Sequence, residues 1–213
     1  MPLIILIFLT SFTSMAIAQD RYYCGYYWAG YATTPPGVGV STSIKTRSPF
    51  VDYDQLFAQW PTVMISYTYE YWVQVGYQKS VNTDYQLEWY IEKKDSNGRG
   101  QLWMSDYDEG YPSSGSTYSY YIYKMANGDW DIYVSAWGSS YSLTTSPNTI
   151  VDYQCFSETS DDSIIIDGTI FNYISYRHTS GDWRLWYDHY PREDGDYILT
   201  ETYDYKFYGD GPP

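Results

Sequence analysis

The sequence predicts an all-β sandwich or jelly roll. Aromatic residues make up 21% of the 213 residues and include 29 Tyr, and such side chains suit the pleated, half-buried surface of a sheet. Turn signals built from Gly, Pro, Asn, Asp and Ser recur at short intervals between these stretches. Many short strands with regular turns are typical of antiparallel sandwiches. No shift in composition marks a linker, so we expect a single domain over residues 19–213.

The turns divide the chain into expected strands. Asn127-Gly128 is the strongest short hairpin signal in the sequence, and Ser180-Gly181 is expected to close a second hairpin. Only residues 53–60 are expected to form a short helix. The expected strands are 26–32, 38–46, 62–67, 70–78, 84–93, 100–105, 117–125, 129–137, 149–158, 164–177, 182–188 and 197–208.

Residues 1–18 have the pattern of a secretory signal peptide. Residues 3–9 form an unbroken apolar run, and Ala16-Ile17-Ala18 gives a small-x-small cleavage site before Gln19. The alternative is an uncleaved membrane anchor, but the apolar segment is shorter than the roughly 20 residues that a spanning helix needs. We therefore expect a secreted protein, located outside the cell or at its surface.

Charge and cysteine content narrow the function classes. The chain carries 26 acidic and 12 basic residues, a formal net charge of −14, and the basic stripes that bind nucleic acid are absent. No later apolar run is long enough to span a membrane, so no membrane association is expected after cleavage. In an oxidising compartment Cys24 and Cys155 are expected to form one disulfide, the alternative being two unpaired thiols.

Three expected strands each carry a line of amide or carboxyl side chains on one face. Because successive side chains of a strand alternate between faces, Gln74 is expected on one face of its strand and Val73 and Val75 on the other. Such lines either converge in a groove on the concave sheet or are the solvated faces of ordinary strands. The lines are Trp72, Gln74 and Gly76; Gln86, Glu88, Tyr90 and Glu92; and Asp152, Gln154, Phe156 and Glu158.

Five segments form a recognisable set in their order and spacing. They are Tyr-Trp-Ala-Gly-Tyr at 27–31, Gly-Val-Gly-Val-Ser-Thr-Ser-Ile at 37–44, Tyr-Trp-Val-Gln-Val-Gly-Tyr at 71–77, Tyr-Gln-Leu-Glu-Trp-Tyr at 85–90 and Cys-Phe-Ser-Glu-Thr at 155–159. The set resembles the glutamic peptidases, the eqolisin family, with the neprosin-like proteins as a related possibility. The resemblance implies a concanavalin-like jelly-roll sandwich of two seven-stranded antiparallel sheets.

The resemblance also implies a catalytic pair. Gln74 matches the catalytic glutamine of the family's Gln-x-Gly strand, and Glu158 is expected to be the catalytic glutamate. The family's acid strand reads Ala-Glu-Trp-Ile-x-Glu, whereas this chain reads Tyr-Gln-Cys-Phe-Ser-Glu over 153–158. If Glu158 corresponds to the second family glutamate instead, Gln154 occupies the catalytic position and the acid is missing. The expected substrate-binding residues are Trp28, Trp72, Glu88 and Tyr90.

A Gln/Glu pair could hydrolyse peptide bonds without a cofactor. The carboxylate would take a proton from water, and the amide would stabilise the oxyanion that forms when this water attacks a peptide carbonyl. No metal is expected, because His178 and His189 lack the spacing of a zinc pair. The expected partner is a polypeptide substrate. The alternatives are a binding module for extracellular glycans, a structural subunit that self-assembles, or glycosidase chemistry by Glu88 and Glu158.

Overall fold

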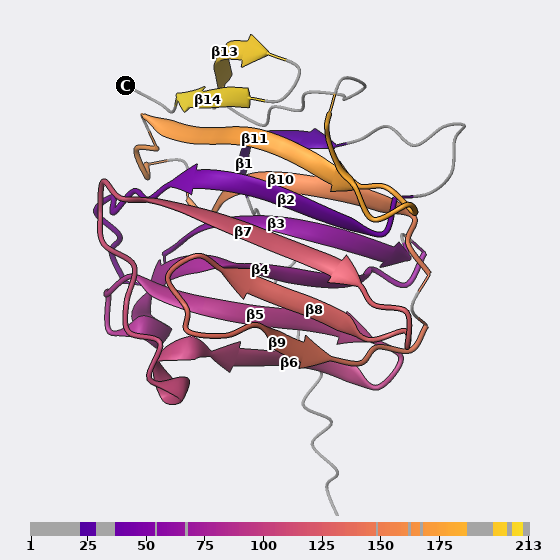
Figure 1. The fold of residues 1–213 in the computed structure, drawn as a ribbon. Helices are drawn as coiled ribbons and strands as arrows, with labels where there is room; N and C mark the ends of the chain where they lie inside the picture. Colours follow the sequence, from indigo (N-terminus) through magenta and orange to yellow (C-terminus); the bar gives the residue numbers. More distant parts are fainter. Residues whose placement is uncertain are drawn as a thin grey trace, which may run out of the picture.

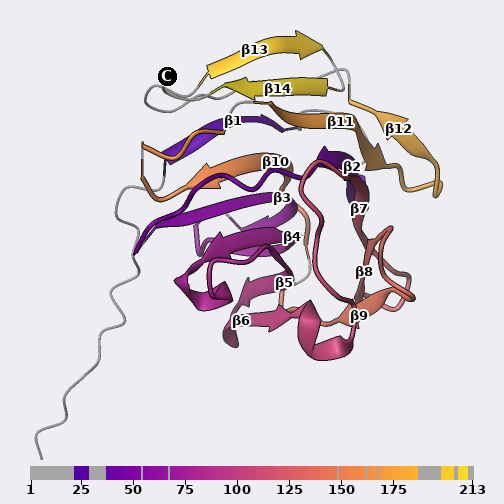
Figure 2. The same ribbon diagram turned by 90° about the vertical axis from the view of Figure 1, so that its left-hand side faces the viewer.

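The computed structural model describes residues 22–28, 37–53, 55–66, 68–147, 149–161, 163–166, 168–186, 198–203 and 206–210. These residues form two antiparallel sheets, which Figures 1 and 2 show as packed layers. This arrangement confirms the predicted all-β sandwich. In strands 22–28, 198–203 and 206–210 only the backbone pairing and Lys206 are described, and the predicted signal peptide lies outside the described residues.

One sheet has six strands and the other has eight, where two sheets of seven were expected. The six-stranded sheet runs in the order β1 (Tyr22–Trp28), β10 (Asp152–Thr159), β3 (Leu56–Ser66), β4 (Tyr71–Ser80), β5 (Glu88–Asp95) and β6 (Gly98–Trp103). The eight-stranded sheet runs in the order β13 (Ile198–Tyr203), β14 (Lys206–Asp210), β11 (Thr169–Arg177), β2 (Gly39–Lys45), β7 (Thr117–Lys124), β8 (Trp130–Val134) and β9 (Tyr141–Leu143), with β12 (Trp183–Leu185) paired to β11.

Local turn chemistry predicts the hairpins correctly. β7 pairs with β8 across Asn127-Gly128, and β11 pairs with β12 across Ser180-Gly181. The expected helix at 53–60 is wrong, because most of this segment belongs to β3. Both edges of β3 are paired, one with β10 and the other with β4, and these two ladders outweigh the weak local preference of a short segment.

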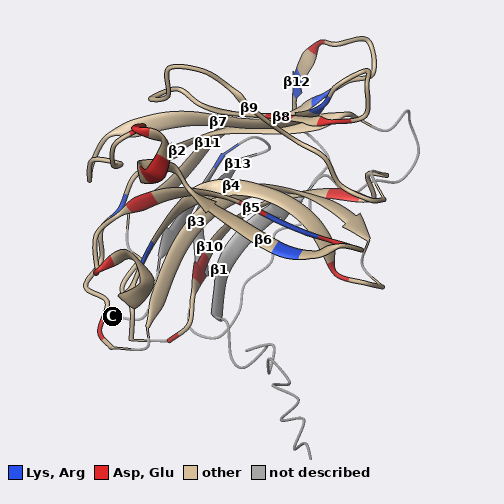
Figure 3. Ribbon diagram, turned by 90° about the horizontal axis from the view of Figure 1, so that it is seen from below, with Lys and Arg blue, Asp and Glu red and all other residues tan. Residues whose placement is uncertain are grey.

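The core lies between the two sheets. Figure 3 shows the layers edge-on. Most inward-pointing residues of the central strands are apolar and buried, among them Val73, Val75 and Trp89 from the six-stranded sheet and Ile122 and Trp130 from the other. Burial of such side chains contributes about 25 cal/mol per Å² of apolar surface.

The described residues contain no helix long and apolar enough to cross a membrane.

A polar network crosses this core and joins the sheets. The Gln59 amide nitrogen donates to Ser157 Oγ at 2.6 Å and to Thr169 Oγ1 at 2.8 Å, and so links β3 to β10 and β11. The Tyr77 hydroxyl donates to Gln59 Oε1 and accepts from the Arg47 backbone N–H. Burial raises the pKa of Tyr77 well above its ordinary value, so the phenol stays protonated as the donor that this network needs.

Asp95 at the end of β5 makes stability depend on pH. Burial acts to raise its pKa, but hydrogen bonds from the Asn97 N–H, the Lys93 ammonium group and the Ser146 N–H hold the pKa of Asp95 below its ordinary value. A carboxyl group whose pKa is lowered by folding stabilises the protein above its unfolded pKa of about 3.9, and this contribution is lost as the pH falls through the folded value.

We therefore expect Asp95→Asn to lower the free energy of unfolding by about 1–3 kcal/mol near neutral pH. The difference between variant and wild type should shrink as the pH falls below about 4. Urea unfolding of both proteins over this pH range measures the difference. Asp106→Asn, at an exposed position, is the control, and a difference for Asp95→Asn that stays constant at every pH would contradict this account.

Candidate functional site

Amide and carboxyl groups gather on the outer face of the six-stranded sheet. The predicted alternation is confirmed, because Val73, Trp89 and Cys155 point into the core while Gln74 and Gln154 lie on the opposite face. The face is not an ordinary solvated one, however. Gln74 is 7% exposed, Gln154 is 8% exposed and Glu158 is 3% exposed. Polar groups so enclosed need partners within the fold, since burying them unpaired is costly.

The register of the strands arranges this face in three parallel rows. We call them the Gln74 row, the aromatic row and the Glu158 row. The Gln74 row consists of Gln154, Thr62, Gln74, Glu92 and Gln101. The aromatic row consists of Phe156, Trp60, Gly76, Tyr90 and Trp103, and the Glu158 row consists of Glu158, Ala58, Gln78 and Glu88.

Gln74 is fixed by two hydrogen bonds. Its amide nitrogen donates to the Tyr90 hydroxyl at 3.1 Å and to Glu92 Oε2 at 2.9 Å. The other oxygen of Glu92 accepts a hydrogen bond from Arg99 in an ion pair. Neighbouring strands therefore hold the amide in one orientation, with both of its N–H donors engaged. To stabilise a bound carbonyl or oxyanion, the amide must turn one of these two N–H donors toward the ligand.

Gln154 lies in the same row as Gln74. Thr62 of β3 pairs with both residues, so two strand spacings, or about 10 Å between Cα atoms, separate them. The Gln154 amide nitrogen donates to Asp152 Oδ2 at 3.3 Å on its own strand. The two residues that flank Thr62 in this row, one on each side of β3, are thus both amides.

Gln74 and Glu158 are not brought together, which corrects the expectation that they share one cavity. Glu158 pairs with Ala58, whereas Gln74 pairs with Thr62, four residues farther along β3. The Cα atoms of Gln74 and Glu158 are therefore about 16 Å apart. The aromatic row lies between them. Glu158 Oε2 accepts from Trp60 Nε1 at 3.0 Å, whereas Gln74 is bonded to Tyr90. The register separates the pair because their partners on β3, Ala58 and Thr62, are four residues apart.

The expected substrate-binding residues divide between the rows. Trp28 pairs with Gln154 and so extends the Gln74 row onto β1, although its side chain is outside the described part of the chain. Trp72 lies on the same face, beside the Gln74 row, with the Lys94 ammonium group 5.0 Å from the ring centroid. Tyr90 contacts Gln74 directly. Glu88 lies in the Glu158 row and accepts a hydrogen bond from Ser105.

The cysteine and metal predictions concern other parts of the molecule. Cys155 is buried on the core side of β10, and burial raises the pKa of its thiol well above the ordinary value. The side chain of Cys24 is not described, so the disulfide stays a prediction. His178 donates to or accepts from Ser180 at 2.8 Å in the turn before β12, and His189 lies outside the described residues. Within those residues no three His, Cys, Asp or Glu side chains gather as metal ligands.

Comparisons with known proteins identify the scaffold. No model of a protein family and no curated protein matches the sequence. Solved structures do match. Scytalido-glutamic peptidase with a transition-state analogue inhibitor has a TM-score of 0.66 and 10% sequence identity, over 91% of this chain and 99% of that one. The chain has the glutamic-peptidase fold.

A second solved structure has a similar fold. SCP-B, described as a member of the eqolisin family in a complex with the tripeptide Ala-Ile-His, matches with a TM-score of 0.58 and 8% identity, over 92% of this chain and 99% of that one. At these sequence identities the similarity establishes the glutamic-peptidase fold alone. Whether this chain has catalytic activity depends on its own side chains. The site must therefore be judged by which side chains share a row.

Sequence reasoning favoured Glu158 and kept Gln154 as the alternative for the catalytic position. The signal for this alternative was present, because the two glutamates of the family's acid strand are four residues apart, and so are Gln154 and Glu158. Sequence reasoning missed Arg99 as the partner of Glu92. The Asn97-Gly98 turn could have indicated this pair, since a tight turn fixes the pairing of β5 with β6.

Proposed function

We propose that this chain is a peptide-binding protein on the glutamic-peptidase fold, with a glutamine in place of the catalytic acid. The observation that carries the proposal is the shared row of Gln154 and Gln74. A neutral amide has no basic group that can take a proton from water at ordinary pH. Without that base, a positioned water is not activated for attack on a peptide carbonyl, and a bound peptide stays intact.

The Gln74 row suits the backbone of an extended polypeptide. Each peptide unit presents one N–H donor and one carbonyl acceptor, and side-chain amides can satisfy both. Trp72 adds a donor, because within the described residues its buried indole N–H has no hydrogen-bond partner. Peptide-like molecules are named as ligands of the similar solved structures. The proposal includes an extracellular location, which rests on the signal-peptide pattern alone.

Removing the Gln74 amide is expected to weaken peptide binding. We expect Gln74→Leu to raise the Kd for an unstructured peptide about tenfold, because one hydrogen bond is lost at a similar side-chain volume. Trp72→Phe keeps an aromatic ring and removes the indole N–H, and it should raise the Kd by a similar factor. Fluorescence anisotropy with a labelled library of short unstructured peptides measures both effects.

The control for this experiment is Gln86→Leu, since Gln86 is exposed and lies before β5. It should leave the Kd unchanged. The proposal would be overturned if no peptide bound the wild-type protein, or if bound peptides were cleaved. Equal affinities for the wild type and the Gln74→Leu variant would move the binding site away from the Gln74 row.

One observation favours a second candidate, peptide hydrolysis with Glu92 as the base. Gln74 and Glu92 form an amide–carboxylate pair at 2.9 Å. The ion pair with Arg99 argues against this role, because the carboxylate is already engaged from both sides. If the wild-type protein cleaves peptides and Glu92→Gln abolishes cleavage, this candidate replaces the binding proposal.

A further inference from the structure

We infer that the outer face of the eight-stranded sheet carries a second binding surface, whose ligand is a carbohydrate chain. The surface is a cluster of four aromatic rings, which we call the aromatic platform. It faces away from the Gln74 row, on the opposite side of the sandwich. The platform consists of Tyr121 and Tyr123 of β7, Tyr133 of β8 and Trp183 of β12.

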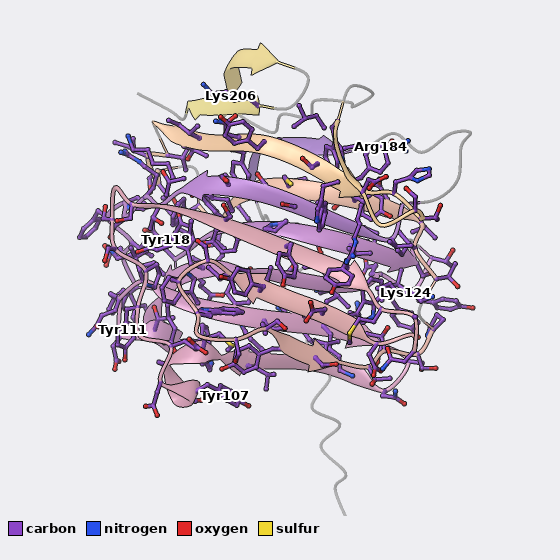
Figure 4. All side chains as sticks on the ribbon, viewed as in Figure 1. Tyr107, Tyr111, Tyr118, Lys124, Arg184 and Lys206 are labelled. Atoms are coloured by element: carbon purple, nitrogen blue, oxygen red, sulfur yellow. The ribbon has the colours of Figure 1, made fainter. Side chains whose placement is uncertain are left out.

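The strand alternation directs these rings outward. Tyr120 and Ile122 of β7 and Ile132 of β8 point into the core, so the residues between and beside them lie on the outer face. Figure 4 looks onto this face, and the platform occupies the end of β7 that the labelled Lys124 marks. Trp183 is 41% exposed. Trp183 is therefore accessible to a ligand from solvent, and the three tyrosines beside it are partly exposed.

Contacts between the rings hold the platform in shape. Tyr121 and Tyr133 are paired across β7 and β8 and stack with their centroids 5.1 Å apart and their planes 24° apart. The ring centroid of Tyr121 lies 5.6 Å from that of Tyr123 and 6.2 Å from that of Trp183. A preformed surface loses little conformational entropy when a ligand binds.

Gly39 and Arg177 complete one edge of the platform. Gly39 pairs with Arg177 on one side and with Tyr123 on the other. A Cβ atom on Gly39 would lie 2.3 Å from the Cβ of Tyr123, so only glycine leaves room between them. The Arg177 side chain passes over Gly39, and its guanidinium carbon lies 3.7 Å from the centre of the Tyr123 ring. This is a close cation–π contact.

Hydrogen-bonding groups surround the rings. The Tyr121 hydroxyl lies 3.4 Å from Asp131 Oδ2. Burial and the nearby Asp131 carboxylate raise the pKa of Tyr121 to about 12, so the phenol remains a donor at physiological pH. Ser41 lies opposite Tyr121 on β2, and farther along the face Ser43 and Ser119 are hydrogen-bonded at 3.0 Å.

This combination fits a sugar better than a phosphate or a protein. A sugar ring has a flat face of C–H groups that stacks on an aromatic ring, and a rim of hydroxyls that needs donors and acceptors. The net charge of −14 disfavours a polyanion. An apolar protein partner would remove Asp131, Arg177 and the serine hydroxyls from water without giving them new hydrogen bonds, which is costly.

The test uses isothermal titration of the full protein with cellohexaose, laminarihexaose and chitohexaose. We expect at least one of these oligosaccharides to bind, and Trp183→Ala and Tyr133→Ala each to raise its Kd about tenfold or more. Tyr53→Ala, at an exposed aromatic residue outside the platform, should leave the Kd unchanged. Gln74→Leu should also leave it unchanged, which separates this surface from the peptide site.

Three results would overturn the inference. The first is that none of the three oligosaccharides binds. The second is that one binds with the same Kd to the wild type and to both platform variants, although each variant keeps its unfolding midpoint. The third is that a proline-rich peptide, and no oligosaccharide, binds in a way that Trp183→Ala abolishes, since aromatic clusters also recognise such peptides.

Discussion

Replacing Gln154 by glutamate is expected to give this protein a peptidase activity that the wild type lacks. The substitution places a carboxylate in the row that already contains the fixed amide of Gln74, with Thr62 between them. A positioned general base contributes about 10²–10⁴-fold to a rate. We therefore expect cleavage of unstructured peptides to rise at least about 10²-fold over the wild-type background, as measured by mass spectrometry of the products.

Two further variants show whether the new activity uses the proposed pair. Gln154→Leu should remain as inactive as the wild type. Adding Gln74→Ala to the Gln154→Glu variant should remove most of the gain, because loss of one oxyanion donor typically costs about 10²–10³ in rate. A folded Gln154→Glu variant that binds peptide and cleaves no faster than the wild type would contradict the assignment of Gln154 to the catalytic position.

Gly76→Ala is expected to cause the largest loss of stability among the substitutions considered. Gly76 lies in the aromatic row on β4, between Trp60 and Tyr90. An added Cβ would lie 2.2 Å from the backbone oxygen of Gln59 and 2.6 Å from the Cβ of Trp60. Because these obstacles belong to the neighbouring strand, β3 and β4 must move apart. Overpacking in a core typically costs about 1–3 kcal/mol, and we expect about 3 kcal/mol here.

Gly100→Ala is the matched control, since a Cβ on Gly100 would meet no atom within 4 Å. It should leave the free energy of unfolding almost unchanged or raise it slightly, because alanine restricts the unfolded chain. Guanidinium unfolding of both variants measures the contrast. The same change in both would mean that the close approach of β3 to Gly76 has no energetic consequence. The glycine of the Gln-x-Gly segment thus serves the packing beside Gln74.

Alternation and turn chemistry made most of the fold predictable. Both are local properties, so the hairpin across Asn127-Gly128 and the outward face of Gln74 could be inferred from neighbouring residues. The helix expected at 53–60 shows the limit of such inference. Whether Leu56 and Phe57 belong to a helix or a strand depends on β10 and β4, and β10 lies about a hundred residues away in the sequence.

The site was harder to predict than the fold. Except for Gln86, which lies before β5, the members of the three polar lines lie on the predicted face. The shift of each strand along its neighbour decides which members meet. That shift comes from long-range pairing, such as Gln154 with Thr62 and Thr62 with Gln74. A displacement of four residues exchanges Gln154 for Glu158, and with it an amide for a carboxylate. Side-chain identity alone could not choose between them.

The most direct test of this account is a mass-spectrometric time course of the wild-type protein with a library of unstructured peptides, from about pH 2 to pH 7, across the range in which carboxyl groups titrate. The account predicts that the peptides bind and remain intact at every pH. Cleavage by the wild type that Glu158→Gln abolishes would contradict it, and would restore Glu158 as the catalytic acid.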